Sequence, residues 1–170
     1  GVDVFVVISG FLITGILRRE VEAGEFSLLG FYDRRLRRIA PALFAVLIVT
    51  LAAGWFLLLP SDYRDMARSA AYSATGLGNL YFFWNTGYFD QTADLQPLLH
   101  MWSLGVEEQF YVVWPLLLFL LMTLIASRRI LLGVLVIGLC ATFAFSVWEV
   151  GVNPKAAFYL PQPRAWELAV

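Results

Sequence analysis

Two clusters of charged residues interrupt an otherwise apolar sequence. The first contains Arg34, Arg35, Arg37 and Arg38, directly before a segment, 39–61, that carries no charge. On a helix Arg34, Arg37 and Arg38 share one face, so their guanidinium groups could converge on a single polyanion. Arginine binds phosphate through two parallel hydrogen bonds, which lysine cannot make. The cluster is therefore a candidate phosphate site, and an anchor for anionic lipid headgroups is the alternative.

The second cluster lies in segment 97–111. It contains the only histidine of the sequence, His100, and the adjacent carboxylates Glu107 and Glu108. Ionisable groups at the edge of an apolar helix are costly, which favours a functional role. A neutral imidazole near a carboxylate can act as a general base for a hydroxyl group. Neighbouring residues point about 100° apart on a helix, so at most one glutamate can face a given site. In the alternative interpretation, His100 caps a helix end and both glutamates face water.

The elements that must position these clusters are membrane helices. Of the 170 residues, 60% are hydrophobic and 15% are charged, against about 45–50% and about 25% in soluble domains. Pro41 is expected in the first turn of the second span. The sequence predicts an all-α, polytopic transmembrane helix bundle with about four full or near-full spans and the start of a fifth. The predicted spans are about 1–17, 40–59, 109–126, 130–148 and 165–170.

Charge bias orients the predicted bundle. Arginines gather within 18–38 and again at Arg128 and Arg129, and the positive-inside rule places both groups on the cytoplasmic side. An even number of spans then separates them, which makes about 61–108 a long extracytoplasmic loop with 66–84 at the membrane interface. His100, Glu107 and Glu108 consequently fall on the opposite side of the second span from the arginine cluster.

Several classes of function find no support. The 12 basic and 13 acidic residues nearly balance, and the arginines lie at the membrane, so nucleic-acid binding is not expected. The sequence has no P-loop, no serine-hydrolase elbow and no H-E-x-x-H motif. One histidine and one cysteine predict no metal site. A transporter or channel, and a lipid-binding scaffold without catalysis, remain as alternatives to an enzyme.

Four sequence blocks follow one another along the chain: Gly1 to Ile13, Phe31 to Pro41 with its paired arginines, His100 to Tyr111, and Phe158 to Leu168. Taken in this order, they resemble the membrane acyltransferase-3 family of bacterial O-acyltransferases. Together these blocks extend over almost the whole chain. Residues 1–170 would accordingly form part of a single transmembrane acyltransferase domain.

The resemblance implies an integral protein of the bacterial cytoplasmic (inner) membrane. Such proteins move an acyl group, usually acetyl, from cytoplasmic acyl-CoA to a hydroxyl of an envelope or exported carbohydrate or glycolipid. The resemblance implies that Arg34, Arg35, Arg37 and Arg38 meet the phosphates of acyl-CoA, and it implies a site role for the block with His100, Glu107 and Glu108. Family members carry a further histidine in a helix that precedes Gly1, so the segment by itself is expected to be inactive.

Overall fold

The computed structural model describes residues 2–85, 96–125 and 127–169, and this part of the chain contains helices and no strand. The predicted all-α fold is therefore confirmed. The helices are α1 (Val2–Glu22), α2 (Leu28–Leu57), α3 (Pro60–Ala74), α4 (Gly78–Asn85), α5 (Met101–Leu124), α6 (Arg128–Val152), α7 (Pro154–Tyr159) and α8 (Pro161–Ala169).

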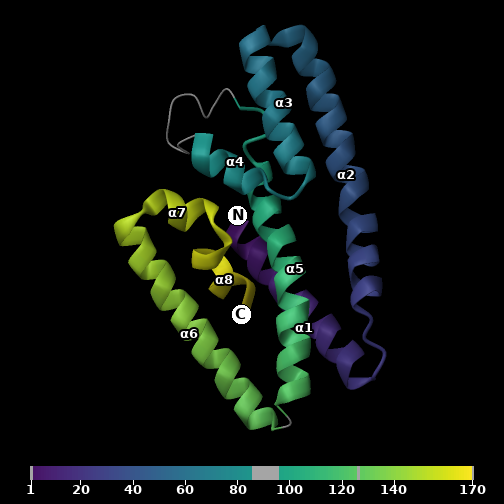
Figure 1. The fold of residues 1–170 in the computed structure, drawn as a ribbon, viewed down its shortest axis with the longest axis vertical. Coiled ribbons are helices and arrows are strands. Elements are labelled where there is room, and N and C mark those ends of the chain that lie inside the picture. The colour runs from purple at the N-terminus through teal and green to yellow at the C-terminus, as the bar shows by residue number, and fades with distance from the viewer. Residues whose placement is uncertain (1, 86–95, 126, 170) are drawn as a thin grey trace.

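Helices α2, α5 and α6 are the three longest of the described helices. Helices α7 and α8 fold back between α5 and α6 (Figure 1). Helices α2, α5 and α6 are long and apolar enough to cross a membrane. Helix α6 has no buried residue although it is apolar on every side, as expected for a helix in lipid. The predicted spans at 1–17 and 165–170 lie in α1 and α8, which are not among the three, and stay predictions.

Helix α2 begins well before the predicted span at 40–59. Ser27 caps it, because the Ser27 hydroxyl accepts a hydrogen bond of 3.2 Å from the Gly30 amide. The arginine cluster is therefore helical, and the ion pair between Arg37 and Asp33 links two neighbouring turns. The expectation that Pro41 opens the helix is wrong, since Pro41 lies inside α2.

Helix α3 folds back along the C-terminal half of α2 (Figure 1). Met66 packs directly on Gly54, where no side chain stands in its way, and the ring of Tyr63 meets Trp55 edge-on at 5.5 Å. The predicted loop 61–108 is thus largely helical, with α3, α4 and the first turns of α5. Its residues 86–95 lie outside the described part of the chain.

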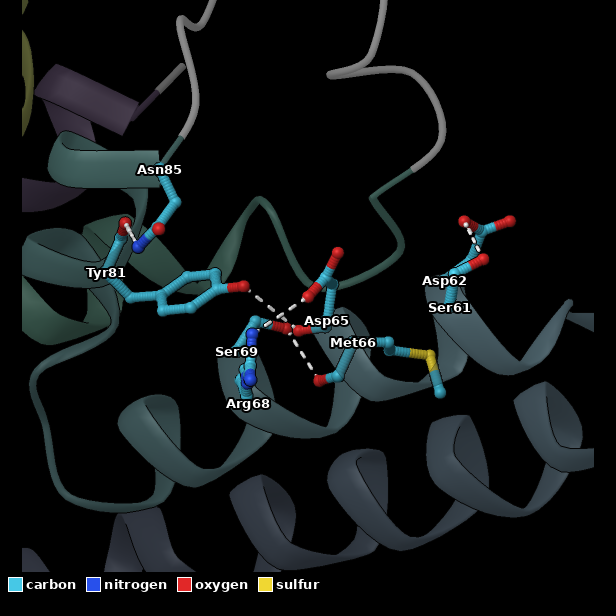
Figure 2. Close-up of polar contacts among 8 residues, drawn as sticks. All are labelled: Ser61, Asp62, Asp65, Met66, Arg68, Ser69, Tyr81 and Asn85. Atoms are coloured by element: carbon cyan, nitrogen blue, oxygen red, sulfur yellow. Dashed lines mark hydrogen bonds and ion pairs between the residues drawn. The ribbon is translucent and has the colours of Figure 1, made fainter.

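A hydrogen bond joins α4 to α3, and a second one lies within α4 (Figure 2). The Tyr81 hydroxyl donates a hydrogen bond of 3.1 Å to the Asp65 carbonyl, and the Asn85 amide donates one of 2.9 Å to the Tyr81 carbonyl. Burial raises the pKa of Tyr81, and the nearby Asp65 carboxylate raises it further. The phenol therefore stays protonated and keeps donating to α3.

The core of the bundle lies where α1 and α8 meet α5. Val6, Ile13 and Leu17 of α1 are almost fully buried. The Trp114 indole donates a hydrogen bond of 2.8 Å to the Thr14 hydroxyl, which ties α5 to α1. Near the start of α5, the guanidinium of Arg164 in α8 lies over the ring of Trp102 at 5.2 Å. These contacts fix α5, which carries the second predicted cluster.

Candidate functional site

A cavity of about 930 Å³ lies between the N-terminal half of α2, the turn after α3, the middle of α5 and the start of α8. Its wall is mainly apolar, with Ile39, Leu43 and Val113 among the lining residues. Arg35 contributes a cation to the wall, and Glu108 contributes a carboxylate. A mostly apolar cavity with a few placed polar groups is the usual form of a small-molecule site.

The arginine cluster divides between two surfaces of α2. Arg34, Arg35 and Arg38 line a smaller cavity of about 170 Å³, together with Phe31 and Ile16. The Arg34 guanidinium is paired with Glu20 at 2.6 Å. Arg37 does not line this cavity, because it pairs with Asp33 at 2.8 Å one turn earlier. The expected convergence of Arg34 and Arg38 is therefore found, but with Arg35 in place of Arg37.

Arg35 links the two cavities, since it lines both. Its guanidinium carbon lies 5.6 Å from the centre of the Phe31 ring and 5.1 Å from the centre of the Tyr111 ring. Both distances fit cation–π contacts. Arg35 is thus half-buried between α2 and α5, and its planar group has a defined orientation.

The contact of Arg35 with Tyr111 corrects the predicted topology. Glu107 and Glu108 do not lie on the far side of the second span from the arginines; Glu108 shares the larger cavity with Arg35. The reason is α3, which runs back along α2 and returns the chain to the level of Leu43 and Phe44 before α5 begins.

The two adjacent glutamates have different surroundings, as the helical geometry predicts. Glu107 is only 3% exposed, and its Oε2 accepts a hydrogen bond of 3.1 Å from the Tyr111 hydroxyl. Its Oε1 has no hydrogen-bond partner among the described residues. Glu108 instead faces the larger cavity, on the same wall as Gly76. Of the two carboxylates, Glu108 is the one that a ligand in this cavity would meet.

His100 lies apart from both cavities. It is exposed at the start of α5, and its carbonyl accepts a hydrogen bond of 3.2 Å from the Ser103 hydroxyl. Its side chain makes no capping hydrogen bond to the helix. The structure therefore brings Arg35 and Glu108 together and leaves His100 outside. A catalytic role for His100 stays a prediction.

An amide pair, the buried Asn79 and the half-buried Gln109, was missed by sequence reasoning. The Gln109 side-chain nitrogen donates to the Asn79 Oδ1 at 2.7 Å and to the Gly76 carbonyl at 3.0 Å. Asn79 is completely buried, and its nitrogen donates to the Tyr159 carbonyl at 3.0 Å. Gln109 stood in the predicted block beside Glu108, but no spacing in the sequence indicates its partner 30 residues earlier.

The amino-acid sequence of the chain is similar to those of known proteins. The chain belongs to the acyltransferase domain family, whose profile matches residues 1–162. The family predicted from the four sequence blocks is therefore confirmed.

Three relatives illustrate the similarity. An uncharacterised protein of Haemophilus influenzae is 41% identical over 118 residues, covering 69% of this chain and 48% of the relative. Peptidoglycan O-acetyltransferase OatA of Listeria monocytogenes is 33% identical over 172 residues, covering 99% of this chain and 28% of the relative. O-acetyltransferase OatA of Staphylococcus aureus is 37% identical over 143 residues, covering 82% and 23%.

The chain thus spans about half of the first relative and less than a third of the other two. None of the solved structures compared with the chain matches it.

Proposed function

We propose that the protein containing this chain is a membrane O-acyltransferase of the bacterial cytoplasmic (inner) membrane. It transfers an acyl group, most simply acetyl, from cytoplasmic acyl-CoA to a hydroxyl of an envelope or exported carbohydrate or glycolipid. The observation that carries the proposal is Arg35, which lines both the small arginine cavity and the larger cavity with Glu108. The names of the relatives, two of them O-acetyltransferases, support the same chemistry.

The small cavity is the proposed phosphate site. Three arginines on one face of α2 offer the paired N–H groups that bind phosphate oxygens, and Arg35 is held by the rings of Phe31 and Tyr111. The charged nucleotide of acyl-CoA would stay at this outer position, because its burial would be costly. Its uncharged pantetheine arm would run along the apolar wall of the larger cavity towards Glu108.

Glu108 is the proposed acceptor of the hydroxyl proton. The hydroxyl oxygen of the carbohydrate attacks the thioester carbonyl carbon, so that a C–O bond forms and the C–S bond breaks. The proton of the hydroxyl passes to a base, for which we propose the Glu108 carboxylate, and then to the departing sulfur, which leaves as the thiol of CoA. His100 and Glu107 are the other candidates for this role, and a comparison of variants decides between the three.

The test uses inside-out membrane vesicles that carry the full-length protein, supplied with acetyl-labelled CoA. Label is followed into the carbohydrate fraction for the wild type and for Glu108→Gln, Glu107→Gln and His100→Ala. We expect labelled carbohydrate with the wild type and a large loss with Glu108→Gln. Loss with His100→Ala alone would instead assign the base to His100. Uptake of label without a covalent product would favour the transporter alternative over acyl transfer.

The phosphate role is tested separately. Replacing Arg35 and Arg38 by glutamine removes two of the three guanidinium groups of the small cavity and should weaken acetyl-CoA binding. Unchanged affinity would rule out this site, and it would favour the lipid-headgroup interpretation of the cluster.

A further inference from the structure

The turn between α3 and α4 contains Gly76. Any other residue at this position would require a shift of the backbone or of neighbouring atoms. Its φ of +72° lies in the left-handed region that favours glycine. A Cβ added at Gly76 would also lie 2.5 Å from the Glu108 Oε2 and 3.5 Å from the Glu108 Cβ. The space where a side chain would stand is therefore occupied by the carboxylate that faces the cavity.

The same turn is fastened to α5 on either side of this contact. The Gln109 side-chain nitrogen donates to the Gly76 carbonyl at 3.0 Å and to Asn79 at 2.7 Å. One turn earlier on α5, an added Cβ at Gly105 would come within 3.2 Å of the Gly76 carbonyl oxygen. Gly105, Glu108 and Gln109 lie on one face of α5 by their spacing of three and four. This face is in close contact with the turn.

We propose that Gly76 and Gln109 are positioning residues for Glu108. Gly76 has no side chain, so the Glu108 carboxylate can lie against it at the cavity wall. Gln109 holds the turn next to Glu108 through its hydrogen bond to the Gly76 carbonyl. The proposal rests on the proposed function, because it assigns Glu108 the hydroxyl proton. It predicts that changes at Gly76 act through Glu108, whereas a merely structural glycine would act through the stability of the turn alone.

The test is a double-mutant cycle of acetyl transfer in vesicles with the full-length protein and labelled acetyl-CoA. Gly76→Ala should lower kcat by about tenfold or more, because its methyl group displaces the carboxylate. Glu108→Asp shortens the side chain and makes room for that methyl group. In the Glu108→Asp background, Gly76→Ala should therefore cost much less than in the wild type, by about a factor of ten.

Gly24 provides a matched control. Its φ is +70°, and an added Cβ would meet nothing within 4 Å. Gly24→Ala thus introduces similar backbone strain without the contact, and it should leave kcat near the wild-type value. An equal loss with Gly24→Ala, or the same loss from Gly76→Ala in both backgrounds, would overturn the proposal.

Gln109→Met tests the positioning of Glu108 if Gly76→Ala fails to accumulate in membranes. It keeps the size of the side chain but removes the donor to the Gly76 carbonyl. We expect a lower kcat with an unchanged KM for acetyl-CoA, because the arginines are untouched; a rise in KM alone would overturn the positioning role. If the wild type itself transfers no label, the proposed function fails first and the positioning proposal fails with it.

Discussion

The guanidinium carbon of Arg35 lies 5.1 Å from the centre of the Tyr111 ring. This contact joins α2 to α5 at the point where both cavities meet. The Tyr111 hydroxyl in turn donates a hydrogen bond of 3.1 Å to the buried carboxylate of Glu107. A cation, an aromatic ring and a carboxylate thus follow one another from the arginine cluster into the interior of the bundle.

Arg35→Lys should weaken acetyl-CoA binding although it preserves the charge. Lysine cannot form the paired hydrogen bonds of a guanidinium group, and it stacks less well on the rings of Phe31 and Tyr111. We expect the Kd for acetyl-CoA to rise by about tenfold, measured by calorimetry on the detergent-solubilised full-length protein. Arg128→Gln, at the exposed start of α6, is the control and should bind as the wild type does. Equal binding by Arg35→Lys would support a simple charge anchor.

The hydrogen bond between Tyr111 and Glu107 predicts that Tyr111→Phe is less stable than Glu107→Gln. Tyr111→Phe removes the hydrogen bond to Glu107 and leaves a buried carboxylate, so it should destabilise the fold by about 1–3 kcal/mol. Glu107→Gln retains an acceptor for the Tyr111 hydroxyl and removes the cost of a buried charge, so it should be close to neutral. Thermal unfolding in detergent measures both variants.

Tyr72→Phe is the matched control for this pair. Tyr72 is 40% exposed, so loss of its hydroxyl should change the unfolding temperature little. If Glu107→Gln proved more damaging than Tyr111→Phe, the carboxylate would require its charge, and a partner other than Tyr111 would have to hold it.

Much of the fold follows from the sequence, because apolar length and charge are local properties. The charge-free segments at 40–59 and 109–126 overlap α2 and α5, and the segment at 130–148 lies within α6. Helix α2 extends N-terminally beyond the predicted span, since Ser27 and the Arg37–Asp33 pair stabilise a helix that includes the arginines. The hairpin of α2 and α3 depends on packing of Met66 on Gly54, which no local pattern indicates.

The sequence predicts two separate clusters of site residues, and it does not predict that Arg35 and Glu108 line one cavity. Spacing on a helix correctly separates the directions of Glu107 and Glu108. It cannot show that Arg35 meets Tyr111, because that contact joins residues far apart in the sequence. The Asn79 and Gln109 pair escaped notice for the same reason, since a buried amide is recognised only by its partners.

The contact between α3 and α4 gives a prediction that involves pH (Figure 2). Tyr81→Phe removes the hydrogen bond to the Asp65 carbonyl and should cost about 0.5–1.5 kcal/mol near neutral pH. Because burial raises the pKa of Tyr81 in the folded state, its contribution is present below about pH 10 and is lost as the pH rises through the folded pKa. Wild type and variant should therefore converge in stability at high pH.

Ser61→Ala is the control for Tyr81→Phe. Among the described residues, the Ser61 hydroxyl hydrogen-bonds only to the neighbouring Asp62 side chain, at 3.3 Å on the exposed start of α3. Its removal should change stability little at any pH. A gap between wild type and Tyr81→Phe that persists unchanged above the folded pKa would contradict the role of the phenol as a donor.

The hydrogen bond from Trp114 to Thr14 predicts how α1 is held on α5. Thr14→Val preserves the shape of the side chain but removes the acceptor, which leaves the indole N–H without its bond of 2.8 Å. Hydrogen bonds between membrane helices contribute about 0.6 kcal/mol on average and up to about 1.7 kcal/mol. Thr142→Val on α6 is the matched control, because within the described part of the chain the Thr142 hydroxyl bonds only to carbonyls of its own helix. We expect unfolding in detergent to show a larger loss for Thr14→Val than for Thr142→Val; equal losses would mean that α1 is held by apolar packing alone.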